Sequence, residues 1–64
     1  MDLILELDER SEQPLHRQVY AGLRAAILAG RVAPGQRLPS TRALAERLGI
    51  SRATVTLGYE QLAS

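Results

Sequence analysis

Two serines and one glycine in the second half of this 64-residue chain constrain its fold more than any other feature. Ser40 and Ser51 each precede a run of helix-forming residues, and a serine at such a position accepts a hydrogen bond from the backbone of the first helical turn. Gly49 lies between the two runs and can adopt the positive backbone angle that a sharp turn needs. The spacing predicts helices at about residues 40–48 and 51–62, joined as a helix-turn-helix.

The apolar residues of these two helices are spaced so that they face a common core. Inward positions recur every three or four residues, as on one side of an amphipathic helix. Ala45 is small enough for a neighbouring helix to approach closely, and Ile50 anchors the turn. The residues predicted to face inward are Leu44, Leu48, Val55, Tyr59 and Leu62, whereas Arg52, Ala53, Thr54 and Thr56 lie on the outward face.

A further helix is predicted before this motif. Pro14 suits the first turn of a helix, and apolar residues then recur at every fourth position. These residues are Leu15, Val19, Leu23 and Ile27. Gly30 ends the pattern, so we place this helix at about residues 14–29.

The first residues of the chain suggest a strand. Leu3, Leu5 and Leu7 occupy alternate positions, a period of two that is typical of a short strand with one apolar face. An unstructured acidic tail is the alternative. We therefore predict one mainly α domain over residues 1–64, in which three helices follow a short N-terminal strand.

Charge is distributed unevenly, although the net charge is only +1. Five of the seven acidic residues lie within the first twelve positions, whereas seven of the eight arginines lie between residues 13 and 64. All eight cationic residues are arginines, whose planar side chain suits phosphate and guanine. The arginine bias of a GC-rich genome explains the absence of lysine, but it does not explain the scarcity of acids after residue 12.

Composition argues against several classes of function. The chain has no cysteine, which removes disulfides and thiolate chemistry and fits a reducing compartment. Its single histidine, His16, has no clustered carboxylate in the sequence beside it, so we predict no catalytic residue, no metal site and no enzyme. The apolar run Leu3-Ile4-Leu5 is too short for a signal peptide or a membrane span. We expect a cytoplasmic protein with no membrane partner.

The helix-turn-helix predicts sequence-specific binding of double-stranded DNA. Its second helix can enter the major groove, where the first exposed side chains reach the bases and the backbone amides approach phosphates. Arg52 begins that helix and could donate to O6 and N7 of a guanine; a surface arginine paired with Glu46 or Glu60 is the alternative. The candidate DNA-binding residues are Ser40, Thr41, Arg42, Ser51, Arg52, Ala53, Thr54 and Thr56.

The same residues resemble the N-terminal winged helix-turn-helix domain of the GntR family of bacterial transcription regulators. The resemblance keeps one register from residue 14 to residue 62. Its motifs are Pro14-Leu15, Gln18-Val19-Tyr20, Leu23, Ile27, Gly30, Pro34-Gly35, Leu38-Pro39-Ser40, Arg42, Leu44-Ala45, Leu48-Gly49, Ser51-Arg52, Thr54-Val55 and Tyr59-Glu60-Gln61-Leu62. The Ser51-Arg52 and Tyr59-Glu60-Gln61-Leu62 motifs are most similar to the MocR branch of the family.

The resemblance implies a bacterial regulator that binds its operator as a dimer and uses Arg42 and Arg52 on DNA, with Ser51 and Thr54 beside them. It also implies a two-stranded wing after the third helix, so we expect a fragment of a larger, effector-responsive regulator, truncated before the wing. The MocR branch holds pyridoxal phosphate through a lysine of a further domain; this chain has no lysine, and we expect no cofactor in it.

Two residues of the third predicted helix depart from the family pattern. Thr56 stands where many members of the family have a further arginine, and Gly58 stands where alanine is usual. By helix propensity alone, Gly58 destabilises its helix by roughly 1 kcal/mol relative to alanine.

A second function stays open on the sequence. Helix-turn-helix units also serve as protein-interaction or dimerisation modules without DNA binding of their own. The acidic first segment would suit such a role, and so would Leu57, which the helix phase predicts to be exposed.

Overall fold

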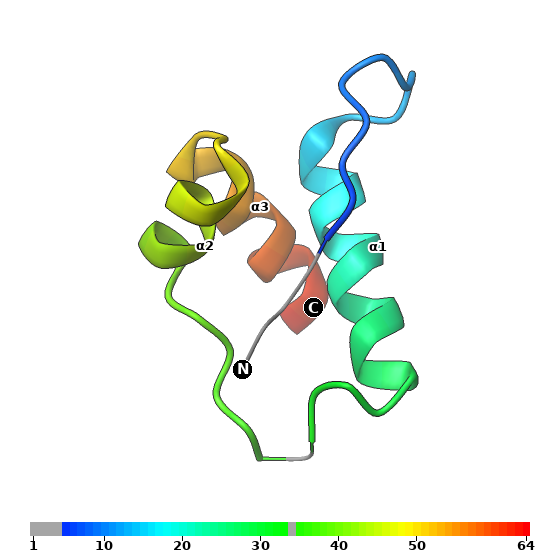
Figure 1. Ribbon diagram of the computed structural model, residues 1–64, viewed down its shortest axis with the longest axis vertical. Coiled ribbons are helices and arrows are strands. Elements are labelled where there is room, and N and C mark those ends of the chain that lie inside the picture. Colours follow the sequence, from blue (N-terminus) through cyan, green and yellow to red (C-terminus); the bar gives the residue numbers. More distant parts are fainter. Residues whose placement is uncertain (1–4, 34) are drawn as a thin grey trace.

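Three helices form the fold in the computed structural model, which describes residues 5–33 and 35–64 (Figure 1). Helix α1 spans Leu15–Leu28, α2 spans Thr41–Leu48 and α3 spans Arg52–Ala63. No strand occurs in the described residues, so the prediction of a mainly α, three-helix fold is confirmed. None of the three helices is both long enough and apolar enough to cross a membrane.

The C-terminus of α1 is closed by a glycine in the left-handed region. Gly30 has a φ of 77°, and its backbone N–H donates to the carbonyl of Ile27 at 3.1 Å. The next N–H, of Arg31, donates to the carbonyl of Ala26 at 2.9 Å. This pair of bonds satisfies carbonyls that the end of a helix leaves open, which explains why α1 stops there.

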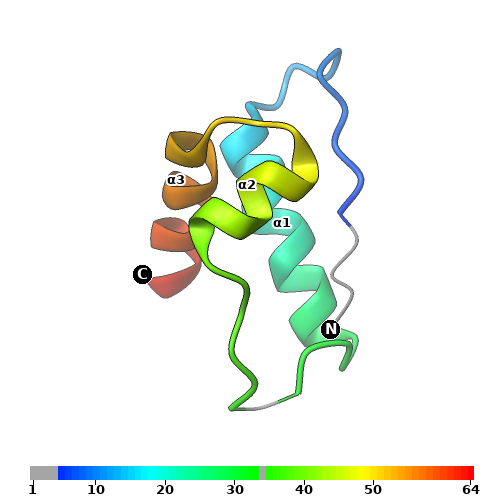
Figure 2. The same cartoon turned by 60° about the vertical axis from the view of Figure 1, so that its left-hand side comes forward.

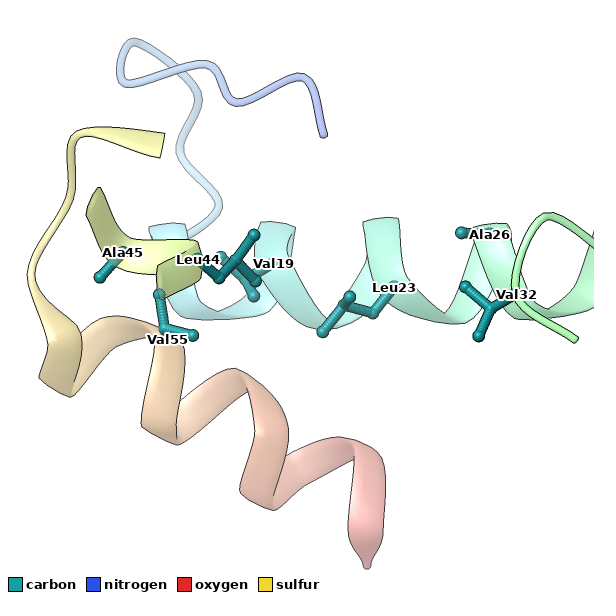
Figure 3. Packing of buried hydrophobic residues seen from close by; sticks show 7 residues of the cluster. All are labelled: Val19, Leu23, Ala26, Val32, Leu44, Ala45 and Val55. Carbon is teal, nitrogen blue, oxygen red and sulfur yellow. The ribbon is translucent and has the colours of Figure 1, made fainter. Parts of the chain in front are cut away.

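The core lies where α3 packs against both α1 and α2 (Figures 1 and 2). Figure 3 shows the side chains of Val19, Leu44, Ala45 and Val55 gathered where the three helices meet, all of them buried. A second group lies towards the end of α1, where Ala26 is near Val32 of the connector, the segment between α1 and α2. Leu23 lies between the two groups. Small aliphatic side chains thus fill the interior of this chain.

One predicted core residue of α1 is not buried. Ile27 belongs to the apolar pattern of the helix, but it is 41% exposed, whereas its neighbour Ala26 is completely buried. At this end of α1 the connector lies against the helix and places Val32 over Ala26. The buried face therefore turns away from Ile27, which is a correction to the sequence prediction.

α1 and α3 approach each other closely at Gly58. A Cβ atom at this position would lie 2.8 Å from Cγ1 of Val19 and 3.2 Å from the carbonyl oxygen of His16. Real side chains essentially never pack so tightly, so the absence of a side chain lets the two helices come together. The glycine that helix propensity disfavours is thus explained by packing.

The predicted N-terminal strand is absent from residues 5–8, and residues 1–4 lie outside the described part of the chain. The segment runs beside α1 instead, with Leu5 and Leu7 packed against the core (Figure 2). At Asp8, the backbone N–H donates to Oε1 of Gln18 at 2.7 Å, and the carbonyl accepts from Nε2 of the same side chain at 2.9 Å. The Gln18 side chain therefore satisfies both backbone hydrogen-bonding groups of Asp8, as the backbone of a neighbouring strand would.

Candidate nucleic-acid interface

Two serine caps determine where α2 and α3 begin. Oγ of Ser40 accepts a hydrogen bond from the backbone N–H of Ala43 at 3.1 Å. Oγ of Ser51 accepts from the backbone N–H of Thr54, also at 3.1 Å. Both serines have extended backbones, as capping residues do. The caps leave the other amides of each first turn free to bind an anion, as helix N-termini commonly do.

The turn between the two helices is tight because one carbonyl accepts two hydrogen bonds. Gly49 has a φ of 69°, and its N–H donates to the carbonyl of Ala45 at 2.9 Å. The N–H of Ile50 donates to the same carbonyl at 3.1 Å. α3 therefore begins only three residues after Gly49, and the short turn fixes the position of α3 relative to α2 (Figure 2).

Arg52 links the first residues of the two helices. Its Nε donates a hydrogen bond to Oγ1 of Thr41 at 3.2 Å, across eleven residues of sequence. The Arg52 side chain is exposed, and the bond leaves its two terminal nitrogens as donors for a ligand. Such a tether limits the rotamers of a long side chain before any ligand arrives.

Arg42 follows Thr41 in α2 and forms an ion pair with Glu46. The distance from its Nε to Oε1 of Glu46 is 3.5 Å, and the two side chains are 79% and 73% exposed. Exposed pairs four residues apart on a helix contribute only about 0.3–0.5 kcal/mol, so a stronger anion can displace the carboxylate. No other ion pair is found in residues 5–33 and 35–64, so the alternative pairing of Arg52 with Glu46 or Glu60 is not formed.

The two threonines of α3 use their hydroxyl groups within the chain. Oγ1 of Thr54 lies 2.7 Å from Oγ of Ser51, and Oγ1 of Thr56 donates to the carbonyl of Arg52 at 2.9 Å. Both threonines are half-buried, whereas Ala53 between Arg52 and Thr54 is exposed. The candidate residues are therefore brought together around the N-termini of α2 and α3, where the three threonines are half-buried and the other five residues are exposed.

Sequence analysis missed one contact that supports this surface. The hydroxyl of Tyr59 donates to the carbonyl of Pro39 at 2.5 Å and so ties α3 to the residue just before the Ser40 cap. Burial raises the pKa of Tyr59 above its usual 10.0. A tyrosine on the inward side of a helix signals that its hydroxyl needs an acceptor, although it does not say which one.

His16, which the sequence analysis rejected as a catalytic residue, lies near the start of α1. It is half-buried, and its Nδ1 is buried without a hydrogen-bond partner among the described residues. Its backbone carbonyl faces Gly58 at the contact between α1 and α3. No group of three or more metal-ligating residues is found in the described part of the chain.

The short capped helices and the glycine turn define a helix-turn-helix protein, and comparison with known proteins identifies its family. A family model described as bacterial regulatory proteins, gntR family, matches residues 15–64. The chain therefore belongs to the gntR family of bacterial regulatory proteins. The resemblance seen in the sequence is confirmed, and with it, at the level of the family, the prediction of a DNA-binding transcription regulator.

Several curated proteins are similar to the chain. It is 51% identical over 59 residues to the probable rhizopine catabolism regulatory protein MocR of Rhizobium meliloti, which covers 92% of this chain and 12% of that protein. It is 64% identical over 36 residues to the HTH-type transcriptional regulator TauR of Rhodobacter capsulatus, covering 56% of this chain and 7% of TauR. It is 37% identical over 60 residues to the HTH-type transcriptional regulator Rv1152 of Mycobacterium tuberculosis, covering 94% and 50%.

The chain spans 12% of the length of MocR and 13% of the length of a further relative, the uncharacterized HTH-type transcriptional regulator YhdI of Bacillus subtilis. The names of both relatives describe regulators. No solved structure matches the chain.

Proposed function

We propose that the chain binds a double-stranded DNA operator with α3 in the major groove. The observation that carries this proposal is the position of Arg52, an exposed arginine in the first turn of α3. Its Nε donates a hydrogen bond to Thr41 of α2, which orients the side chain. In a helix-turn-helix the first turn of the second helix is the part that reaches base edges. Arg52, the side chain best placed to contact a base, is thus positively charged and already oriented by a hydrogen bond.

Arg52 would read a guanine. With Nε bonded to Thr41, the terminal nitrogens remain to donate to O6 and N7 of one guanine, the commonest specific contact in the major groove. A contact of this kind discriminates against other bases by roughly 1–3 kcal/mol. Ser51, Thr54 and Thr56 would support the first turn through their internal hydrogen bonds.

Arg42 would hold a phosphate. Its ion pair with Glu46 is exposed and long, so the arginine can exchange that carboxylate for the DNA backbone. Ser40 and Thr41 lie beside it at the N-terminus of α2, where backbone amides favour an anion. This contact would set the position of the protein on DNA without reading sequence.

The biological unit would be a dimer that belongs to a longer regulator of transcription. The support is family membership together with the length of the relatives, most of which lies outside the matched region. A dimer would place two copies of α3 on two half-sites about one helical turn of DNA apart.

Fluorescence anisotropy with labelled duplexes tests the proposal. The chain should bind a random-sequence duplex with an affinity that falls linearly with salt on logarithmic axes, and selection from a random library should yield a preferred site. Arg52→Ala should weaken binding to that site more than to random DNA, whereas Arg42→Ala should weaken both alike. Arg10→Ala is the matched control, since it removes an arginine from the loop before α1.

The opposite result is equally clear. A chain that is helical by circular dichroism but binds no duplex at low salt would overturn the proposal and favour the protein-interaction module. Equal losses from Arg42→Ala and Arg52→Ala on every duplex would remove the base-reading role of Arg52 alone.

A further inference from the structure

The outer face of α3 carries an apolar surface next to Arg52. A shallow hollow on this face is lined by Arg52, Ala53, Thr56, Leu57 and Glu60. Leu57 is 51% exposed, and it is the large apolar side chain that lines this hollow.

Helix geometry places Ala53 and Leu57 at the far side of α3 from the core. Val55 and Gly58 are buried, and Tyr59 and Leu62 pack partly against the same interior. At 3.6 residues per turn, positions 53 and 57 lie above one another on the opposite side of the helix. Leu57 therefore contributes little to the folded core, and its side chain is displayed to whatever α3 binds.

We propose that Leu57, with Ala53, contacts the C5-methyl group of a thymine in the major groove and so selects sequence beside Arg52. This inference rests on the proposed DNA-binding function. Among the base edges in the major groove, the thymine methyl is the apolar group, and apolar side chains recognise it. Leu57 thereby becomes a specificity-determining residue of the same site.

The spacing along α3 predicts where that thymine lies. Leu57 follows Arg52 by five residues, which is about 7.5 Å along a helix axis. For a helix that follows the groove, this distance corresponds to about two base-pair steps of 3.4 Å. The preferred site should thus contain a thymine about two base pairs from the guanine that Arg52 reads.

The arginine that lines the hollow favours DNA over a second protein. Arg52 lines the same hollow as Leu57, so the apolar surface is continuous with the cation assigned to a guanine. Glu60 lines the hollow three residues beyond Leu57, and phosphates repel its carboxylate. The section of α3 between these two charges is therefore suited to neutral base edges rather than to the DNA backbone.

Replacing thymine by deoxyuracil tests the contact, because it removes only the C5-methyl group. Each thymine of the selected duplex is replaced in turn, and dissociation constants are measured by anisotropy for the unmodified chain, Leu57→Ala and Leu28→Ala. Leu28 is a matched control, being 70% exposed on α1. One replacement should weaken DNA binding by the unmodified chain and by Leu28→Ala about fourfold, which is the effect of burying one methyl group. The same replacement should not change the affinity of Leu57→Ala. Leu57→Met, which keeps a large apolar side chain, should lose affinity on the same replacement as the unmodified chain does.

Four outcomes would overturn the inference. If no deoxyuracil replacement matters, or if it weakens the unmodified chain and Leu57→Ala equally, Leu57 does not read a methyl group, whereas salt-dependent binding and the Arg52→Ala effect would keep the proposed function. If Leu57→Ala instead changes the oligomeric state in sedimentation, the surface binds a second copy of the chain. If the folded chain binds no DNA, both proposals fail.

Discussion

Nε of Arg52 donates a hydrogen bond to Oγ1 of Thr41 at 3.2 Å, and this single bond joins the first residue of α3 to the first residue of α2. Thr41 was a candidate DNA contact on the sequence. Its hydroxyl accepts from the arginine and can still donate to a phosphate, so the geometry adds a second role to the predicted one. We therefore treat Thr41 as a positioning residue for Arg52.

Thr41→Val should weaken binding to the preferred site by about 1 kcal/mol, roughly fivefold, because valine keeps the shape of threonine but cannot accept the hydrogen bond. Affinity for random duplexes should stay unchanged, and Thr41→Ser should retain specific binding. Anisotropy on both duplexes measures the difference. A fall in affinity on random DNA as well would instead make Thr41 a phosphate contact.

Local signals in the sequence were sufficient for the helix-turn-helix. Ser40, Gly49 and Ser51 act on backbone groups within a few residues of themselves, so their spacing was enough to predict both caps and the turn. The inward positions of Leu44 and Val55 followed from helical period. Features with such short range need no knowledge of the rest of the fold.

Contacts between segments that are distant in the sequence could not be predicted from it. The bond from Tyr59 to Pro39 and the approach of α1 to Gly58 both depend on how the helices are arranged in space. The predicted strand failed for a related reason, since alternation of apolar residues cannot show that a side chain, Gln18, replaces the partner strand. Helix periodicity likewise could not show where the connector would cover α1.

Gly58→Ala should destabilise the chain, although alanine is the better helix former. The added Cβ would lie 2.8 Å from Cγ1 of Val19 and 3.1 Å from its Cβ, so the two helices must separate. Overpacking of this kind costs about 1–3 kcal/mol. Urea unfolding followed by circular dichroism gives the free energy of unfolding, and an increase of about 1 kcal/mol would mean that helix propensity prevails.

A second variant tests whether Val19 is the cause. In the background Val19→Ala, the substitution Gly58→Ala should be less destabilising than in the unmodified chain, because the shorter side chain removes the nearest atom. The carbonyl of His16 would remain 3.2 Å from the new Cβ, so part of the cost should persist. Strictly additive free energies would show that the two positions do not interact.

Tyr59→Phe should lower the free energy of unfolding by about 1 kcal/mol, because it removes the hydrogen bond to the carbonyl of Pro39 while keeping the ring in the core. The residue before the Ser40 cap would lose its link to α3, so specific DNA binding should weaken as well. Tyr20→Phe, which removes the other tyrosine hydroxyl from α1, serves as control. Equal stability of the two variants would contradict the assigned role of the bond.

Alkaline pH should weaken the fold through the same tyrosine. Burial raises the pKa of Tyr59 in the folded state above the value of 10.0 for an exposed tyrosine, so the folded chain holds the phenol proton more tightly than the unfolded chain does. This contribution to stability is fully present below about pH 10 and is lost as the pH rises through the folded pKa. Unfolding free energies measured from about pH 8 to about pH 11 should therefore fall more steeply for the unmodified chain and Tyr20→Phe than for Tyr59→Phe. Parallel curves for all three would show that the Tyr59 hydroxyl is equally exposed in the folded and unfolded chain.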